Sequence, residues 1–200
     1  MDRTLLARML LIAAMVMCLA LLVGGAALKP GYTHSASLIS ELNATGTPWA
    51  SAIGWFGFLP VGLLLTAFLF TAAPRVNVRG ASRLGYWLLL SQPIAYIGAV
   101  LVPCDAGCPL EGSLSQALHN LLGVLTYPAG GIGIVLLATA PGLTPANRIA
   151  LAFAGGLWLG LFLLMVIPEL APWRGVFQRI AEVILYAVLV FTAWRMMPRK

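Results

Sequence analysis

The sequence predicts an all-α polytopic membrane protein, a bundle of six transmembrane helices. Hydrophobic residues make up 60% of the 200 residues and charged residues only 9%, and the mean hydropathy is +0.94. Soluble domains carry about 25% charged residues, so this composition excludes an ordinary soluble protein. Six apolar stretches with short links take up nearly the whole chain. We therefore expect a single domain over residues 1–200.

Each predicted helix is long enough to cross a bilayer, because about 20 apolar residues span a hydrocarbon core of about 30 Å. Such stretches predict helices at about residues 5–28, 51–73, 83–103, 118–140, 149–168 and 176–197. Prolines and glycines, as at Lys29-Pro30-Gly31 and Pro141-Gly142, mark their ends. The first stretch follows two arginines as a signal peptide would, but it exceeds the roughly 7–15 apolar residues of a cleavable segment. We expect a retained helix.

The distribution of charge predicts the orientation. Six spans place both termini on one side, which holds nine of the twelve basic residues: Arg3, Arg8, Arg75, Arg79, Arg83, Arg148, Arg195, Arg199 and Lys200. The other side holds Lys29, Arg174 and Arg179 together with Glu41, Asp105, Glu111, Glu169 and Glu182. The positive-inside rule then predicts cytoplasmic N- and C-termini in a cell membrane, inner or plasma. The same rule explains the net charge of +6, and we exclude nucleic acid as a partner.

Polar residues without a role in topology gather at the outer end of the bundle. Residues 31–42 are compatible with a short interfacial helix that has His34, Ser37 and Glu41 on one face and leucine and isoleucine on the other. They are equally compatible with a solvated loop. Both interpretations stay open at the level of sequence.

Two cysteines, Cys104 and Cys108, stand four residues apart in a turn rich in proline and glycine. On an oxidising face this spacing favours a disulfide, because such a turn can bring the Cα atoms close enough. A zinc site would need two more ligands, for which His119 and His34 are the candidates. Haem ligation by the two histidines would require one ligand from a loop. We expect the disulfide, no metal and no cofactor.

The helices carry a few polar groups of their own. His119-Asn120 lies near the outer end of the fourth helix. In the sixth helix, Arg179 and Glu182 stand three residues apart and are predicted to form a local pair. This pair is either a functional site or a structural link between helix ends. Gln92, Tyr96 and Tyr127 lie beside prolines and either satisfy freed carbonyls or line a cavity that descends from the outer face. Glycine clusters near residues 130–133 and 155–160 predict close helix packing. We expect no charge near the middle of a span.

Several short motifs carry a family resemblance: Pro30-Gly31-Tyr32, Ile39-Ser40-Glu41-Leu42, Cys104-Asp105, Gly107-Cys108-Pro109, His119-Asn120, and Gly175 with Arg179. With them the chain resembles the prokaryotic six-helix membrane family called domain of unknown function 998. The resemblance implies the fold and no activity. Ile39-Ser40-Glu41 with Gly46-Thr47-Pro48 is similar to an element of the eukaryotic six-helix family of damage-regulated autophagy modulators. Some members of that wider group are linked to lipid remodelling, which implies a lipid ligand only by analogy.

The expected function is binding of a membrane lipid or another small amphiphile in an outward-facing polar pocket. The candidate residues are His34, Ser40, Glu41, His119, Asn120, Arg179 and Glu182. Arg179 would meet an anionic headgroup, and the carboxylates an ammonium or hydroxyl group. The alternatives are a membrane enzyme with Glu41 or His119 as general base on a lipid, a small-solute transporter, and a structural or accessory subunit. No catalytic sequence motif supports the enzyme.

Overall fold

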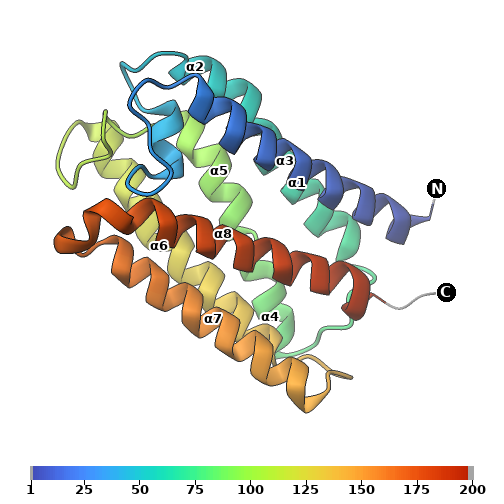
Figure 1. The fold of residues 1–200 in the computed structure, drawn as a ribbon. Coiled ribbons are helices and arrows are strands. Elements are labelled where there is room, and N and C mark those ends of the chain that lie inside the picture. The colour runs from blue at the N-terminus through green and yellow to red at the C-terminus, as the bar shows by residue number, and fades with distance from the viewer. Residues whose placement is uncertain (1, 198–200) are drawn as a thin grey trace.

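The computed structural model describes residues 2–197, and in this part of the chain it contains helices and no strands (Figure 1). Six helical segments within these residues, some of them made of more than one helix, are long and apolar enough to cross a membrane. This confirms the predicted all-helical class and the six spans. Arg199 and Lys200, counted above among the cytoplasmic charges, lie outside the described residues.

The spans contain eight α-helices with short irregular pieces between some of them. Within residues 2–197 these are α1 (Arg3–Ala27), α2 (Ala50–Ile53), α3 (Leu59–Ala72), α4 (Ala81–Leu88), α5 (Ser91–Leu101), α6 (Leu114–Leu137), α7 (Pro145–Met165) and α8 (Arg174–Phe191). The π-helical η2 (Gly54–Phe58) joins α2 to α3, and the π-helical η4 (Thr192–Met196) extends α8. Two 3₁₀ turns, η1 (Ile39–Asn43) and η3 (Pro168–Trp173), lie in the loops.

Two helices begin about four residues earlier than hydropathy predicts. The hydroxyl of Ser113 accepts a hydrogen bond from the backbone N–H of Gln116 at 3.2 Å, so α6 starts at Leu114 and not at residue 118. Thr144 caps α7 in the same way, and Pro145 follows at the first helical position. These polar caps satisfy backbone donors that have no partner inside the helix. Hydropathy detects the apolar part of a span and misses its polar first turn.

The third span is interrupted in the middle. The α-helix α4 ends at Leu88 and α5 starts at Ser91. Pro93 explains the break, because a proline ring clashes with the carbonyl four residues earlier, here that of Leu89. The span therefore has a short discontinuity beside Pro93, and the side chain of Gln92 lies inside the bundle, where it is 2% exposed.

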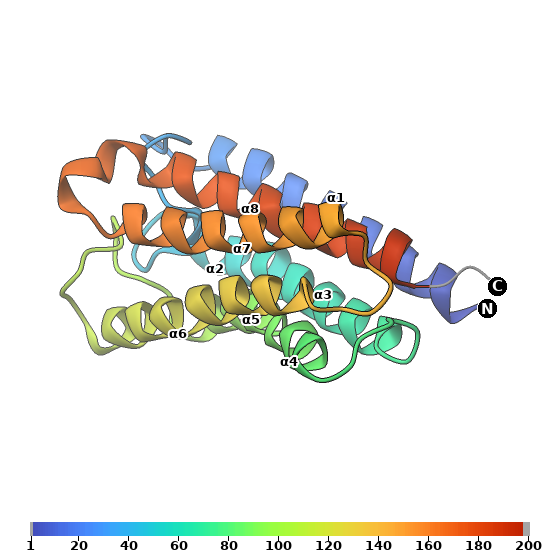
Figure 2. The same cartoon turned by 90° about the horizontal axis from the view of Figure 1, so that it is seen from below.

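Neighbouring helices pack closely through glycines. Contacts run from α1 to α3, from α3 to α5, from α4 and α5 to α6, and on through α7 to α8, which also contacts α1 (Figure 2). A Cβ added at Gly85 would lie 2.6 Å from the carbonyl oxygen of Gly133, and one at Gly155 would lie 2.8 Å from that of Gly131. Part of the predicted small-residue surface therefore serves helix contact. Gly160 has open space around it and does not.

The start of α1 and the end of η4 lie at one end of the bundle in both views (Figures 1 and 2). We call the opposite end, formed by residues 28–49, 102–113 and 166–173, the distal end. There the interfacial helix, one of the two alternatives left open for residues 31–42, does not form. Turns occupy residues 29–37, and only the 3₁₀ turn η1 is helical. Nearly all of the predicted site residues belong to this end or to the helix segments just below it.

Candidate functional site

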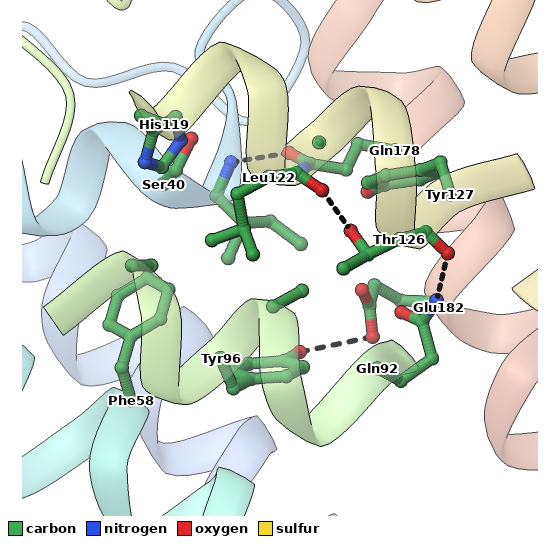
Figure 3. A pocket seen from close by; sticks show the side chains of 14 residues that line it. Ser40, Phe58, Gln92, Tyr96, His119, Leu122, Thr126, Tyr127, Gln178 and Glu182 are labelled. Carbon is green, nitrogen blue, oxygen red and sulfur yellow. Dashed lines mark hydrogen bonds between the residues drawn. The ribbon is translucent and has the colours of Figure 1, made fainter. Parts of the chain in front are cut away.

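A hollow opens among α5, α6 and α8 beneath the loops of the distal end (Figure 3). Its volume is about 490 Å³ with its open mouth included. We call it the inner hollow. Its lining residues are Ile39, Ser40, Phe58, Gln92, Ala95, Tyr96, Ala99, His119, Leu122, Gly123, Thr126, Tyr127, Gln178 and Glu182. Apolar side chains form much of the wall, and polar groups from four different segments converge inside it.

Glu182 supplies the only carboxylate among these lining residues, and it is 6% exposed. The hydroxyl of Tyr96 donates a hydrogen bond of 3.0 Å to Oε2 of Glu182 (Figure 3). Glu182 lies eight residues after Arg174, about 12 Å along a helix axis, and three residues before the midpoint, residue 185, of the stretch Arg174–Met196 formed by α8 and η4. The expectation that no charged residue occurs near the middle of a span is therefore wrong. A buried acid at such a depth is costly in a membrane and commonly marks a functional site.

A second hollow adjoins the first between α6, α7 and the start of α8. Including its open side, its volume is about 1000 Å³. We call it the outer groove. It shares Ser40, His119, Gly123, Tyr127 and Gln178 with the inner hollow, and its further lining residues are Leu38, Cys108, Leu110, Asn120, Val124, Phe162, Met165, Val166, Ile167, Pro168, Ala171 and Arg174. The two hollows are neighbours with a common wall.

The outer groove presents apolar side chains at the surface of the bundle. Val124 is 55% exposed, Val166 49% and Leu110 75%. Phe162 stacks on Tyr127 with ring centroids 5.3 Å apart, which lines part of the groove with aromatic surface. These exposed side chains make the groove an apolar surface at the side of the bundle.

Arg179 does not enter either hollow, and its predicted pairing with Glu182 is wrong. The guanidinium donates to the hydroxyl of Tyr32 at 2.5 Å, to Nδ1 of His34 at 3.1 Å and to the carbonyl oxygens of Ser37 and Gly175 at 3.0 and 2.9 Å. It also lies over the ring of Tyr32. Arg179 and His34 thus fasten the loop after α1 to the start of α8. Burial raises the pKa of Tyr32, and the neighbouring guanidinium opposes that shift.

Glu41 is also occupied by structural contacts. Its Oε1 accepts a hydrogen bond from the backbone N–H of Leu38 at 2.7 Å and forms an ion pair of 2.8 Å with Arg174. The guanidinium of Arg174 donates further to the carbonyl oxygens of Ala36 and Gly107 at 3.0 and 2.8 Å. Glu41 and Arg174 together tie two loops of the distal end to the start of α8. Glu41 therefore does not line the predicted pocket.

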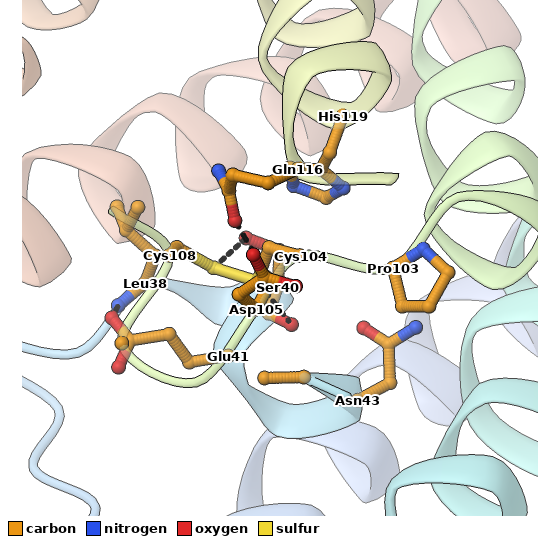
Figure 4. Close-up of a disulfide and its surroundings, with 12 residues drawn as sticks. Leu38, Ser40, Glu41, Asn43, Pro103, Cys104, Asp105, Cys108, Gln116 and His119 are labelled. Atoms are coloured by element: carbon orange, nitrogen blue, oxygen red, sulfur yellow. Dashed lines mark hydrogen bonds between the residues drawn. A yellow bond between two sulfur atoms is a disulfide. The ribbon is translucent and has the colours of Figure 1, made fainter. Parts of the chain in front are cut away.

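Cys104 and Cys108 form a close pair at the mouth of the hollows, with Cα atoms 5.1 Å apart, and Figure 4 draws them joined. Ser40 contacts both: its hydroxyl lies 3.4 Å from Sγ of Cys108, and its carbonyl oxygen lies 3.6 Å from Sγ of Cys104. His119 lies beside the pair, with Nδ1 2.9 Å from the carbonyl oxygen of Val102. The cysteine turn, η1 and α6 thus meet at this point.

Other polar groups of the distal loops hold the loops in place. The carboxylate of Asp105 accepts hydrogen bonds from the backbone N–H and the hydroxyl of Ser113, both at 2.8 Å, which lower the pKa of Asp105. Nδ2 of Asn120 donates to the carbonyl oxygen of Leu110 at 2.9 Å while its Oδ1 accepts from Gln116 at 2.8 Å. Asn120 lines the outer groove with its amide already engaged.

The structure therefore separates the predicted site residues into two groups. Ser40, His119 and Glu182 line the inner hollow, with Asn120 in the adjoining groove. His34, Glu41 and Arg179 lie outside both. Gln178 is not among the predicted site residues, yet it lines both hollows and accepts a hydrogen bond of 2.5 Å from the backbone N–H of Ile39. Its position four residues before Glu182 was the available signal, because such residues share one helix face.

The family described as "Protein of unknown function (DUF998)" matches residues 12–195 of the chain. The protein belongs to this family. The match extends from α1 to η4 and confirms the resemblance seen in the sequence motifs. No curated protein and no solved structure matches the chain. The similarity to the damage-regulated autophagy modulators stays a prediction, and membership of DUF998 assigns no activity.

Proposed function

We propose that this DUF998 protein binds an amphiphile that carries hydroxyl or ammonium groups, with its polar part in the inner hollow. The observation that carries the proposal is that two hollows adjoin, one with polar groups inside it and one lined mostly by apolar side chains. The inner one ends at the buried carboxylate of Glu182, and the outer one is apolar and open at the side of the bundle. An amphiphile entering sideways would keep its chain against Phe162 and Val124.

The charges around the inner hollow favour a donor ligand. Among the described residues that line it, none is lysine or arginine, whereas Glu182, Gln92 and the hydroxyl of Thr126 offer acceptor oxygens. A carboxylate forms its strongest contacts with ammonium and hydroxyl donors. The anionic headgroup expected at Arg179 loses its support, because that guanidinium already has four acceptors around it.

We also propose the orientation in which the distal end faces away from the cytoplasm, in an inner or plasma membrane. The excess of arginine at the terminal end supports this through the positive-inside rule. On that outer face, the close pair Cys104–Cys108 would form a disulfide wherever no reductant acts on it. Reporter fusions at the C-terminus and in the loop after α5 test the orientation, and activity of an extracytoplasmic reporter at the C-terminus would contradict it.

Gly123 offers a direct test of the binding function. It lines both hollows, and a Cβ added there would meet no atom within 4 Å. Gly123→Leu should therefore place an apolar side chain at the junction of the hollows, with its Cβ in open space. Gly160→Leu is the matched control, because Gly160 also lies within a helix, has the same open surroundings and lines neither hollow.

Native mass spectrometry of the gently purified protein measures the outcome. We expect an added mass of a lipid or another amphiphile on the wild type and on Gly160→Leu, and its loss from Gly123→Leu with the folded protein retained. An unmodified mass for the wild type, or equal ligand on both glycine variants, would contradict binding in these hollows. A bound species that is a cleaved or altered lipid would favour the enzyme instead.

A further inference from the structure

We propose that Cys104, Cys108 and His119 form a redox-gated zinc site, which binds Zn²⁺ when the two cysteines are reduced and releases it when they are joined. One ligand atom from each of these residues lies within 4.8 Å of the others. Cys104 is fully buried and Cys108 is 7% exposed, so both sulfur atoms are shielded. The proposal does not rest on the amphiphile, although Cys108 and His119 also line the outer groove described above.

The hydrogen bonding of His119 suits a zinc ligand. Nδ1 lies 2.9 Å from the carbonyl oxygen of Val102, which can only accept, so Nδ1 carries the proton and Nε2 keeps its free electron pair. Metal-binding histidines commonly show this arrangement, in which a carbonyl group fixes the ring and its tautomer. His34, the other histidine considered as a ligand, instead accepts a hydrogen bond from Arg179 and is not part of the cluster.

The backbone around the cysteines is held by contacts other than the sulfur–sulfur bond. The carbonyl oxygen of Cys104 accepts from the N–H of Thr45 at 2.8 Å, and the N–H of Cys108 donates to the carbonyl oxygen of Asp105 at 2.9 Å. Asp105 is tied in turn to Ser113. Reduction therefore leaves the two side chains side by side, and rotation about their Cα–Cβ bonds separates the sulfur atoms to the spacing that a metal requires.

The chemistry of the donors selects zinc. Two thiolates and one imidazole suit Zn²⁺, which takes four ligands in a tetrahedron. A reductant such as a dithiol adds two electrons and two protons to the disulfide, and the resulting thiols release two protons when they bind the cation. The three residues leave one position of the tetrahedron, which a water molecule takes. Three protein ligands and one water are the arrangement of catalytic zinc sites.

Cobalt spectroscopy of the untagged, detergent-purified full chain tests the proposal. Co²⁺ replaces Zn²⁺ and reports thiolate ligands by a charge-transfer band and tetrahedral geometry by its visible bands. After reduction with a phosphine, which does not compete for the metal, we expect one equivalent of Co²⁺ to produce both signals and Zn²⁺ to abolish them. The oxidised protein should produce neither.

Variants assign the ligands. Cys104→Ser and Cys108→Ser should each reduce the charge-transfer intensity by about half or more, and His119→Ala should weaken binding at least tenfold. Cys18→Ala and His34→Ala are the matched controls and should bind as the wild type does. The comparison of oxidised and reduced wild type needs no variant, so it holds even where a cysteine variant folds poorly. Absence of the charge-transfer band from the reduced wild type, or its persistence in both serine variants, would overturn the proposal.

Discussion

Replacing Glu41 by glutamine distinguishes a binding residue from a structural one. Glu41→Gln keeps the size of the side chain and an acceptor oxygen but removes the charge from two contacts, those with Arg174 at 2.8 Å and with the N–H of Leu38 at 2.7 Å. Hydrogen bonds to a charged group contribute about 1.5–3 kcal/mol and neutral ones about 0.5–1.5 kcal/mol. We therefore expect the free energy of unfolding to fall by about 2 kcal/mol.

The side chains of Arg174 and Glu41 are only 23% and 14% exposed, so water screens this pair less than a surface pair. A loss of this size corresponds to a fall in melting temperature of about 4–8 °C for a chain of this length. Thermal unfolding in detergent measures it, and Glu111→Gln, at an exposed glutamate, is the matched control. A double-mutant cycle with Arg174→Met should give a coupling energy of about 1 kcal/mol, because the two substitutions remove one shared contact.

The refuting result is specific. If Glu41→Gln melts with the wild type and loses the co-purified amphiphile, Glu41 contacts the ligand and its assignment to the loop contacts is wrong. If it melts lower and keeps the ligand, the structural assignment is supported. For Glu182→Gln, the same two measurements should show an unchanged melting temperature and loss of an ammonium ligand. The reason is that the carboxylate of Glu182 would interact directly with the charge of that ligand.

Three further predictions concern the distal end. Gly175→Ala should lower the free energy of unfolding by about 1–3 kcal/mol, because its Cβ would lie 2.5–2.8 Å from three carbonyl oxygens of the loop after α1. Gly156→Ala is the control and should not lower it, because Gly156 has open space around it. Thermal unfolding compares the two variants. Arg179→Lys should destabilise the protein by about 2 kcal/mol in the same assay, since an ammonium cannot reproduce the planar set of donors. Asp105→Asn should lower stability at neutral pH, because it removes the carboxylate that Ser113 stabilises. The difference from the wild type should shrink as the pH falls below 3.8 and the wild-type carboxylate is protonated. Melting curves over a pH series measure it, and a difference that does not change with pH would contradict a stabilising role of the charged carboxylate.

The apolar stretches of the sequence determined the fold class and the six spans, and its short motifs determined the membership of the family. These features depend on local hydropathy and short motifs, which a single chain displays directly. The closeness of Cys104 and Cys108 was predictable for the same reason, because only four residues separate them. Polar caps such as Ser113 escaped detection, since a hydrophobic window ends before the cap.

Only the tertiary structure decided which polar residues share a hollow. Glu41 and Arg179 look like site residues in the sequence, yet their partners lie far along the chain, at Arg174 and at Tyr32. Glu182 looks like the partner of its neighbour Arg179, but it faces Tyr96 on another helix. Spacing along one helix defines a shared face but not what packs against that face. Contacts between helices depend on how all six spans pack together, and that is where the inner hollow arises.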